Sequence, residues 1–395
     1  MSEKKGFPEK PRILIICNYY LPGYKSGGGL RTLVHMVERF HDRYDFRVIT
    51  LDHDGDKIPF TTVEINDWNE IEKAQVFYLS KDKANISKLR ELIIEIKPDS
   101  IYLNSVFSKL TVFYLTLRKL KLIPAIKTIL APEGELSGGA LKLKSYKKKP
   151  FVTLAKSAGL YRNLFWKTTA DPEKQETERF KGRGGVIFVA PNLPSRELLE
   201  NYRQDLKPKK NVGEVKMIFL SRFMRKKNFK WLVDNLSGFE GNLTIDIYGP
   251  IEDESYWEAT ATAIAKLPPN VKIKYGGVLE YDKVPGKLFE YHFFVLPTVG
   301  ENFGHVFIEA LAAGCPLLIS DRTPWRDLEA KNVGWEVPLE NPAKWLEVLN
   351  YCVNLDQLSY TKISENSHRF ARRWLLNPEV EEDTLKVLEY SLTNS

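Results

Sequence analysis

The sequence predicts an α/β fold made of two domains with mainly parallel β-sheets. Short runs rich in β-branched and aromatic residues alternate with stretches of helical period in both halves of the chain. This alternation is typical of strand and helix units whose strands run parallel. A length of 395 residues is long for a single hydrophobic core. A segment rich in proline and charge, 191–215, also interrupts the periodicity near the middle of the chain.

Each half supplies six candidate strands, bounded by turn residues. In the first half they are 12–18, 46–51, 76–79, 99–103, 126–130 and 186–190. In the second half they are 215–221, 243–248, 271–275, 293–297, 317–320 and 334–337. Helix-period stretches lie between them, such as 30–40, where Leu30, Leu33, Val34, Val37 and Phe40 share one face. We place the domain boundary near 205–212.

Composition and cysteine usage exclude several classes of protein. A hydrophobic fraction of 43% and a charged fraction of 28% are ordinary for a globular chain and exclude disorder. The three cysteines, Cys17, Cys315 and Cys352, have no spacing that indicates a disulfide framework or a zinc site. No signal peptide or membrane span is predicted. We therefore expect a cytoplasmic protein, either free or at the inner face of the membrane.

The net charge of the chain is +7, and a cluster of lysines contributes to it. It lies in "KLKSYKKK", ahead of the partly apolar "PFVTLAKSAGLYRNLFW". One interpretation is a solvated turn before a core helix. The other is attraction to an anionic lipid surface or an anionic acceptor. No continuous basic stripe is present, which argues against nucleic acid as a partner. The cluster comprises Lys142, Lys144, Lys147, Lys148 and Lys149.

Ligands of open α/β sheets bind beyond the carboxyl ends of the strands, so we expect the functional residues on the loops that follow strands. After the first strand, Gly27, Gly28 and Gly29 precede a helix, where backbone N–H groups favour an anion. A flexible structural turn is the alternative. After the first strand of the second half, "SRFMRKKNFKWL" places Arg222 and Lys227 where a strand leads into a helix. There they either bind phosphate or form a solvated face.

The later strand ends of the second half carry a different chemistry. Gly249 lies in the Gly-Pro turn of "YGPIEDESYW", and a Gly-Gly turn opens "GGVLEYDKV". The last of these segments is "ENFGHVFIEALAAGC". A helix starting at about Phe303 would contain Glu309 and leave Glu301 just ahead of its first turn, whose N–H groups favour an anion. In order, these strand ends suit a nucleoside diphosphate attached to a hydroxyl-rich group.

The segment "LDHDGD" after the second strand holds Asp52, Asp54 and Asp56. It is a solvated turn, a loop that contacts an acceptor, or a metal site. Its glycine and acids do not follow the spacing of an EF-hand. His292, His305 and His368 also lack metal-ligand spacing, so no metal site is expected.

The segments "SRFMRKKN", "YGPIEDESYW" and "PTVGENFGHVFIEALAAGCPLLISDRTPW", with its Glu-x7-Glu, resemble the family-4 glycosyltransferases of the GT-B fold. These are retaining enzymes of bacterial polysaccharide assembly. The resemblance extends from "CNYYLPGYKSGGGLRTLV" through "PEGELSGGALKLKS" to the final helix. It implies two facing Rossmann-like domains with a ligand cleft between them. We expect an acceptor-side domain over 1–205, a nucleotide-sugar domain over 206–375, and a helix over 376–395 that packs back on the first domain.

The resemblance also implies roles for individual residues. Arg222 and Lys227 would hold the donor diphosphate, Glu301 the hydroxyls of the donor sugar, and Glu309 the ribose diol. Asn302, Phe303, Gly304 and Gly249 would line the donor site, and the loop of Gly27, Gly28 and Gly29 would close over the donor. The loop "APEGELSGG" lacks the histidine that many relatives carry there, and it offers Glu133 and Glu135 instead. These two acids, with Asp52 and Asp54, are the candidate acceptor residues.

The expected activity is transfer of a sugar from a nucleoside diphosphate sugar to a hydroxyl of a glycan or lipid-linked glycan. We expect the nucleotide of the donor to be UDP. Anomeric configuration would be retained, and no metal or other cofactor is expected, since cationic side chains and a helix start can stabilise the leaving diphosphate. One alternative is another GT-B enzyme, such as a sugar-nucleotide epimerase or a phosphorylase. A second is a scaffold that binds nucleotide sugars without catalysis.

Overall fold

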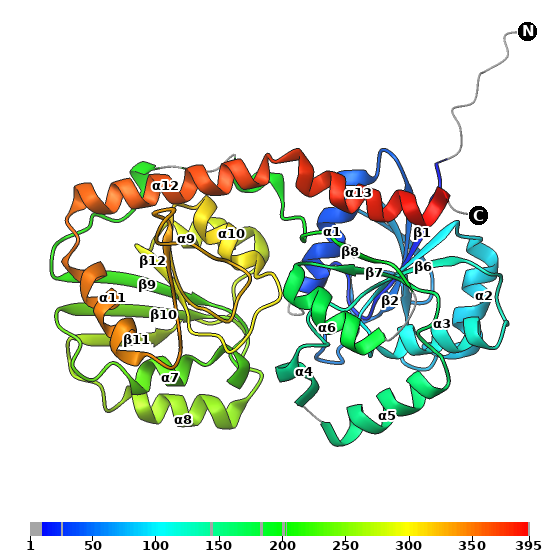
Figure 1. The fold of residues 1–395 in the computed structure, drawn as a ribbon, viewed down its shortest axis with the longest axis horizontal. Coiled ribbons are helices and arrows are strands. Elements are labelled where there is room, and N and C mark those ends of the chain that lie inside the picture. Colours follow the sequence, from blue (N-terminus) through cyan, green and yellow to red (C-terminus); the bar gives the residue numbers. More distant parts are fainter. Residues whose placement is uncertain are drawn as a thin grey trace, which may run out of the picture. The chain divides into compact units, whose positions relative to one another are not determined.

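The computed structural model describes residues 10–24, 27–142, 145–181, 185–199, 202 and 204–393. Its contacts divide the chain into two units. The first comprises the residues up to Leu193 together with those from Pro378 onward, and the second runs from Pro194 to Asn377. The boundary expected from the sequence, 205/206, falls inside the second unit. Each unit is built on one sheet (Figure 1).

Within the described residues, the sheet of the first unit has eight strands in the order β3-β4-β2-β1-β5-β6-β7-β8. All neighbours pair in parallel except β3 and β4, which are antiparallel. The strands are β1 (Arg12–Ile16), β2 (Asp45–Leu51), β3 (Trp68–Ile71), β4 (Ala74–Leu79), β5 (Ser100–Asn104), β6 (Lys127–Ala131), β7 (Phe165–Thr168) and β8 (Ile187–Val189). Of these, β3 and β7 were not expected from the sequence.

Helices cover both faces of this sheet (Figure 1). Ile13 and Ile15 of β1 pack in one core with α1 and α13, whereas Leu14 and Ile16 pack in another with α2, α3 and α6. The four residues after Arg12 are all apolar because their successive side chains enter different cores. The helices of this unit are α1 (Gly28–Phe40), α2 (Ile86–Ile96), α3 (Lys109–Lys119), α4 (Gly138–Lys142), α5 (Ser145–Ser157), α6 (Asp171–Lys181) and α13 (Pro378–Thr393).

The C-terminal helix α13 belongs to the first unit. The hydroxyl of Ser391 hydrogen-bonds to that of Ser100 on β5 over 2.7 Å. The ring of Tyr390 packs edge-on against Phe165 and Phe188, with centroid distances of 5.0 and 5.1 Å. These contacts fix α13 to a sheet that is formed by the first half of the chain.

In the described part of the second unit, six parallel strands follow the order β11-β10-β9-β12-β13-β14. They are β9 (Glu214–Leu220), β10 (Asn242–Tyr248), β11 (Val271–Tyr275), β12 (Phe293–Leu296), β13 (Leu317–Ser320) and β14 (Gly334–Val337). The two mainly parallel sheets expected from the sequence are thus confirmed. Both units are of the Rossmann type, in which strand order reverses at one point of the sheet.

The helices of the second unit enclose its sheet in one hydrophobic core. They are α7 (Phe229–Asp234), α8 (Glu254–Ile264), α9 (Val284–Leu288), α10 (His305–Ala312), α11 (Pro342–Asn354) and α12 (Gln357–Leu375), with short 3-10 turns η1 (Arg196–Leu199), η2 (Gln204–Leu206), η3 (Arg225–Lys227) and η4 (Tyr281–Lys283). Cys315 and Cys352 lie in this core, and Cys17 lies in the core that β1 of the first unit forms with α1 and α13, as buried free thiols. The cysteines therefore act as apolar packing residues.

Candidate functional site

The carboxyl ends of β9 and β12 lie side by side at the point where strand order reverses in the second sheet. β10 and β11 follow β9 on one side of it in the sheet. The chain then crosses to the other side of β9, where β12, β13 and β14 lie in that order. Loops that follow the two central strands diverge at such a point and leave room for a ligand. Most of the donor-site residues expected from the sequence lie on these loops.

Backbone and hydroxyl groups hold the two loops together. The carbonyl oxygen of Lys226 accepts from the N–H of Val299 at 2.9 Å and from the hydroxyl of Thr298 at 3.1 Å. Thr298 is buried, and its carbonyl oxygen accepts from the hydroxyl of Ser320. The loop after β9 is therefore fixed relative to the loop after β12, which makes the position between them rigid.

Lys227 and Glu301 form the central ion pair of the site, through Nζ and Oε2. The Lys227 side chain is 10% exposed and that of Glu301 16%. Burial raises the pKa of Glu301, but attraction and a hydrogen bond from Lys227, with the charges of Lys226 and Arg222, outweigh it and lower the pKa overall. Glu301 is therefore an ionised acceptor of hydrogen bonds at neutral pH. The sequence indicated both residues but not their pairing.

Arg222 extends from the end of β9 and is half-buried, with an Nη1 to Oε1 bond of 3.0 Å to Glu252. A guanidinium has five N–H donors, so this single bond leaves others for a ligand. Gly249 allows this close arrangement of strand ends. Its φ is 130°, and a Cβ there would lie 2.1 Å from the carbonyl oxygen of Ser221. Only glycine fits at such a distance.

The helix that follows β12 begins at His305, two positions later than the expected start at about Phe303. Gly304 caps it with a φ of 78°, and a Cβ on Gly304 would lie 2.5 Å from the ring of Phe307. The start was expected too early because the residue pattern does not show that Gly304 adopts a left-handed conformation ahead of the helix. Glu309 lies inside α10 and is buried, while Asn302 and Gly304 lie ahead of the first turn.

Phe303 has a packing role that the sequence did not indicate. Its ring lies against those of His305 and Trp325, at centroid distances of 5.0 and 5.9 Å. Its carbonyl oxygen accepts from the indole N–H of Trp325 at 2.7 Å. Phe303 thus anchors the loop between Glu301 and α10, and its side chain packs in the core of the second unit.

The glycines of the first unit differ from the expected loop. Gly27 has a φ of 76° and caps α1, so Gly28 and Gly29 lie in the first turn of the helix and not ahead of it. Asn104, at the end of β5, donates to the carbonyl oxygen of Gly29 at 3.1 Å. The start of α1 is therefore fixed to the carboxyl end of the neighbouring strand.

Both aspartates predicted to contact an acceptor are buried. Asp54 accepts from the backbone N–H of Tyr24 at 2.6 Å, and Gly23 packs so closely that a Cβ there would lie 2.8 Å from its Cγ. Asp52 pairs with Nδ1 of His53 at 2.7 Å. Among the described residues, no group of three or more His, Cys, Asp or Glu could hold a metal ion. These aspartates organise loops. His53, which lies between them, was not among the site residues expected from the sequence.

Glu135, another candidate acceptor residue, binds the end of β5. Its carboxylate accepts from the hydroxyl of Ser105 at 2.8 Å and from the backbone N–H groups of Val106 and Phe107 at 2.7 and 3.2 Å. Ser105 itself has a φ of 116°, which this network stabilises. Glu135 therefore has a clear structural role in shaping the loop after β5.

Glu133 belongs to a buried polar network. It accepts from the Asn192 amide at 3.0 Å and lies 3.9 Å from Nζ of Lys167. Burial raises the pKa of Glu133, and the charge of Lys167 offsets this only in part. Burial likewise lowers the pKa of Lys167, against the opposing effect of Glu133 and Glu173.

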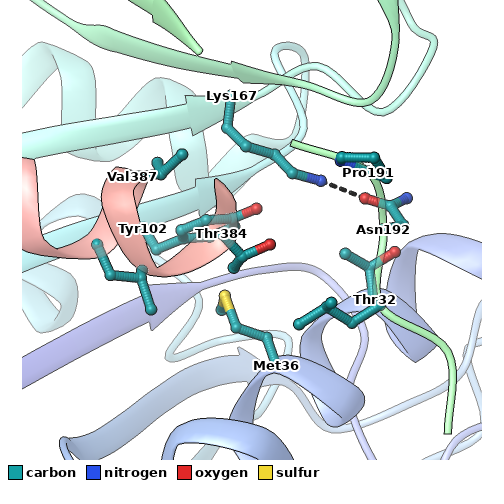
Figure 2. A pocket seen from close by; sticks show the side chains of 10 residues that line it. Thr32, Met36, Tyr102, Lys167, Pro191, Asn192, Thr384 and Val387 are labelled. Carbon is teal, nitrogen blue, oxygen red and sulfur yellow. Dashed lines mark hydrogen bonds between the residues drawn. The ribbon is translucent and has the colours of Figure 1, made fainter. Parts of the chain in front are cut away.

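A small cavity lies beside this network (Figure 2). Figure 2 shows the Lys167 ammonium hydrogen-bonded to Asn192, on the side of the cavity where Pro191 follows β8. Thr32 and Met36 of α1, Tyr102 of β5 and Thr384 of α13 line the rest of it. The network thus joins the carboxyl ends of β6 and β7 to the segment that leaves the first unit.

The lysine cluster lies at α4 and α5. Lys144 is outside the described residues, and so are the side chains of Lys142, Lys147, Lys148 and Lys149. Farther along α5, Leu154 is 70% exposed. In the part of the chain that the structure describes, no helix is both long and apolar enough to cross a membrane.

Comparison with known families identifies the second unit. Residues 201–370 match the family model described as glycosyl transferases group 1. The chain contains a group 1 glycosyltransferase domain. That domain includes the loops after β9 and β12, with the Lys227–Glu301 pair and Arg222.

One sequence relative and two solved structures are similar to this chain, and the two structures show its fold. A protein from Klebsiella pneumoniae, described as an uncharacterized 41.2 kDa protein in the cps region, is 23% identical over 295 residues, which are 71% of this chain and 78% of that protein. HepE from Anabaena, solved with UDP and glucose, is 16% identical with a TM-score of 0.67, over 96% of this chain and 100% of that one. Sucrose-phosphate synthase from Thermosynechococcus elongatus is 12% identical with a TM-score of 0.72, over 98% and 100%. The fold is GT-B.

Proposed function

We propose that this protein is a retaining glycosyltransferase that moves a sugar from a UDP-sugar to a hydroxyl of a glycan or lipid-linked glycan during synthesis of a cell-surface polysaccharide. The observation that carries the proposal is the Lys227–Glu301 pair, with Arg222 beside it, at the strand reversal of a group 1 glycosyltransferase domain. The UDP in the HepE structure and the cps-region location of the Klebsiella relative support the choice of donor and pathway class.

The chemistry follows from the charges of this site. As the bond between the sugar and the diphosphate breaks, its electron pair goes to the diphosphate oxygen, where negative charge grows. Arg222 and Lys227 stabilise that charge, together with the N–H groups at the start of α10. Glu301 accepts hydrogen bonds from sugar hydroxyls, and Glu309 from the ribose diol. The acceptor hydroxyl attacks on the same face as the leaving group, and its proton goes to the leaving phosphate oxygen.

These cations supply the charge stabilisation that a divalent metal supplies in other transferases. We therefore propose that the reaction proceeds in the presence of EDTA. Loss of activity in EDTA that Mg²⁺ restores would contradict this.

The first test is binding of nucleotides. Thermal unfolding is measured with UDP, GDP and ADP, and then with their common sugars. A ligand at 100 times its dissociation constant stabilises by about 2.7 kcal/mol. UDP is expected to give the largest shift, and equal absence of a shift with all three would contradict the proposal. Slow hydrolysis of the bound donor without an acceptor separates an enzyme from a non-catalytic scaffold.

We also propose that the first unit contacts an anionic membrane surface through the lysine cluster. The observation that supports this is Leu154, an apolar side chain that is 70% exposed on the same helix as Lys147, Lys148 and Lys149. Basic and exposed apolar side chains together are typical of helices that lie in a membrane interface. Such contact would bring the enzyme to a lipid-linked acceptor.

A further inference from the structure

The carboxyl end of β2 presents an imidazole that a neighbouring carboxylate orients. Nδ1 of His53 lies 2.7 Å from Oδ1 of Asp52. The Asp52 side chain is only 7% exposed, whereas that of His53 is 18% exposed. The backbone of Asp52 is fixed as well, because its N–H donates to Leu79 at 3.2 Å and its carbonyl oxygen accepts from Phe60 at 2.7 Å. The carboxylate is therefore a rigid reference for the ring.

This pairing determines which nitrogen of His53 carries the proton. An ionised carboxylate only accepts hydrogen bonds, so Nδ1 of His53 is the donor to Asp52. In the neutral ring, Nε2 then keeps its lone pair and acts as an acceptor. Across the described residues, no hydrogen bond to Nε2 is formed. The partly exposed ring thus offers one acceptor atom to an incoming group.

Two loops hold this imidazole at the ligand-binding edge of the first sheet. The backbone of His53 forms an isolated antiparallel bridge with Pro59. Its ring meets that of Tyr19 edge-on, with centroids 6.3 Å apart, and Tyr19 belongs to the loop after β1 that leads to Gly27 and α1. The carboxylate of the neighbouring Asp54 accepts a hydrogen bond from the N–H of Tyr24 in the same loop. His53 therefore lies beyond the carboxyl ends of β1 and β2, where parallel sheets bind ligands.

We propose that His53 accepts a hydrogen bond from a hydroxyl of the glycan acceptor, and that Asp52 is the positioning residue that holds Nε2 in its acceptor form. The inference rests on the proposed function and names the residue that recognises the acceptor. The chemistry favours a hydroxyl because an unprotonated nitrogen needs a donor. Ionised phosphate oxygens only accept hydrogen bonds, so the donor diphosphate is not a partner for it.

The test measures transfer and hydrolysis together. UDP-glucose is the donor and octyl β-glucoside the acceptor, and the ratio of transfer to hydrolysis is determined for each variant. His53→Phe is expected to lower that ratio and the kcat/KM for the glycoside about tenfold, equivalent to about 1.4 kcal/mol. His53→Gln, whose amide oxygen can accept the same hydrogen bond, is expected to recover much of the loss. Asp52→Ala is expected to raise the KM for the glycoside more than it lowers kcat.

A matched control exists in the same unit. His41 also lies beside an aspartate, with Nε2 3.3 Å from Asp42, but it caps the end of α1 ahead of β2, at the opposite edge of the sheet. His41→Phe is expected to leave the ratio unchanged. A wild-type ratio in His53→Phe, or no recovery in His53→Gln, would overturn the inference while UDP binding still supports the proposed function. Absence of UDP binding in the wild-type protein would instead overturn the proposed function itself.

Discussion

The ammonium of Lys227 binds the carboxylate of Glu301, which joins the loop after β9 to the loop after β12. Both groups are mostly buried, so neither is fully compensated by water if the other is removed. The pair also explains why Glu301 stays ionised despite its burial. Under the proposed function, a cation for the diphosphate and an anion for the sugar are thus held in place before any ligand arrives, which is the arrangement that electrostatic catalysis requires.

Replacing Lys227 by alanine is expected to slow turnover more than it weakens donor binding. In the proposed mechanism the ammonium stabilises charge that grows as the sugar departs, and only interactions that strengthen in the transition state raise kcat. By comparison with the loss of one oxyanion donor, kcat should fall roughly a hundred- to a thousandfold, or about 2.7 to 4 kcal/mol. Steady-state kinetics with UDP-glucose measure both parameters.

Lys230→Ala is the matched control for this experiment. Lys230 lies one turn farther along, on α7, where it pairs with Asp234 of the same helix at 2.7 Å. Its removal should leave both kcat and KM nearly unchanged. An increase in KM alone for Lys227→Ala would mean that Lys227 binds substrate and transition state equally, and its catalytic role would be abandoned.

Glu309→Gln is expected to weaken binding of free UDP. The change keeps the shape of the side chain but removes the charge that would strengthen the proposed hydrogen bond from the ribose diol, and such bonds contribute roughly 1.5 to 3 kcal/mol. Calorimetry with UDP and with 2′,3′-dideoxy-UDP measures the effect. The variant should discriminate less between these two nucleotides than the wild type does. Equal discrimination would show that Glu309 does not contact the ribose.

Gly249→Ala is expected to destabilise the second unit and impair UDP binding. The new Cβ would meet the carbonyl oxygen of Ser221 at 2.1 Å, which forces the ends of β9 and β10 apart next to Arg222. Gly277→Ala is the control, since Gly277 also has a positive φ, of 89°, but no atom within 4 Å of the added Cβ. Backbone strain alone costs about 1 to 3 kcal/mol, so Gly249→Ala should unfold at the lower temperature of the two. Equal melting temperatures would rule out the close approach.

Much of this architecture could be predicted from the sequence because apolar strands of a parallel sheet are buried on both faces. The expected strands at 317–320 and 334–337 coincide with β13 and β14. The strand expected at 271–275 coincides with β11, where apolar residues alternate with exposed lysines at the edge of the sheet. β3 and β7 were missed because "WNEI" and "FWKT" are short and carry polar residues. In β7, Lys167 is buried through its interactions with Asn192 and Glu133, which no local pattern shows.

The site was predicted less completely than the fold. Arg222, Lys227 and Glu301 were expected to lie together from their positions after strands, since parallel strands bring such loops to one edge. The contacts among side chains depend on loop geometry that sequence does not specify. The sequence does not show, for example, that Asp52 and Asp54 are buried or that His53 between them is the more exposed group.

Acidification is expected to destabilise the first unit through His35. This buried ring binds the carbonyl oxygen of Leu193 through Nδ1 at 2.8 Å, and burial lowers its pKa from 6.5 to about 4. The unfolded chain therefore binds more protons than the folded one between these pH values, so the free energy of unfolding falls as pH drops through that window. His35→Asn keeps a donor near the position of Nδ1 but does not titrate. Its melting temperature should depend less steeply on pH from 6.5 to 4, and an unchanged slope would show that His35 is not the group responsible.

Removal of positive charge from α5 is expected to weaken binding to anionic vesicles. The variant replaces Lys147, Lys148 and Lys149 by serine, and each lysine near such a surface contributes about 1 kcal/mol. A second triple variant replaces Lys81, Lys83 and Lys97, which are exposed in the same unit, and so changes the net charge equally. Sedimentation with phosphatidylglycerol vesicles at low and high salt compares the two. The α5 variant should lose most of its low-salt binding while the control retains it, because the control lysines lie around α2 and not on the helix that carries Leu154, which is 70% exposed. Equal binding by both variants would mean that the interaction reflects overall charge alone, and the assignment of α5 as the contact surface would be withdrawn.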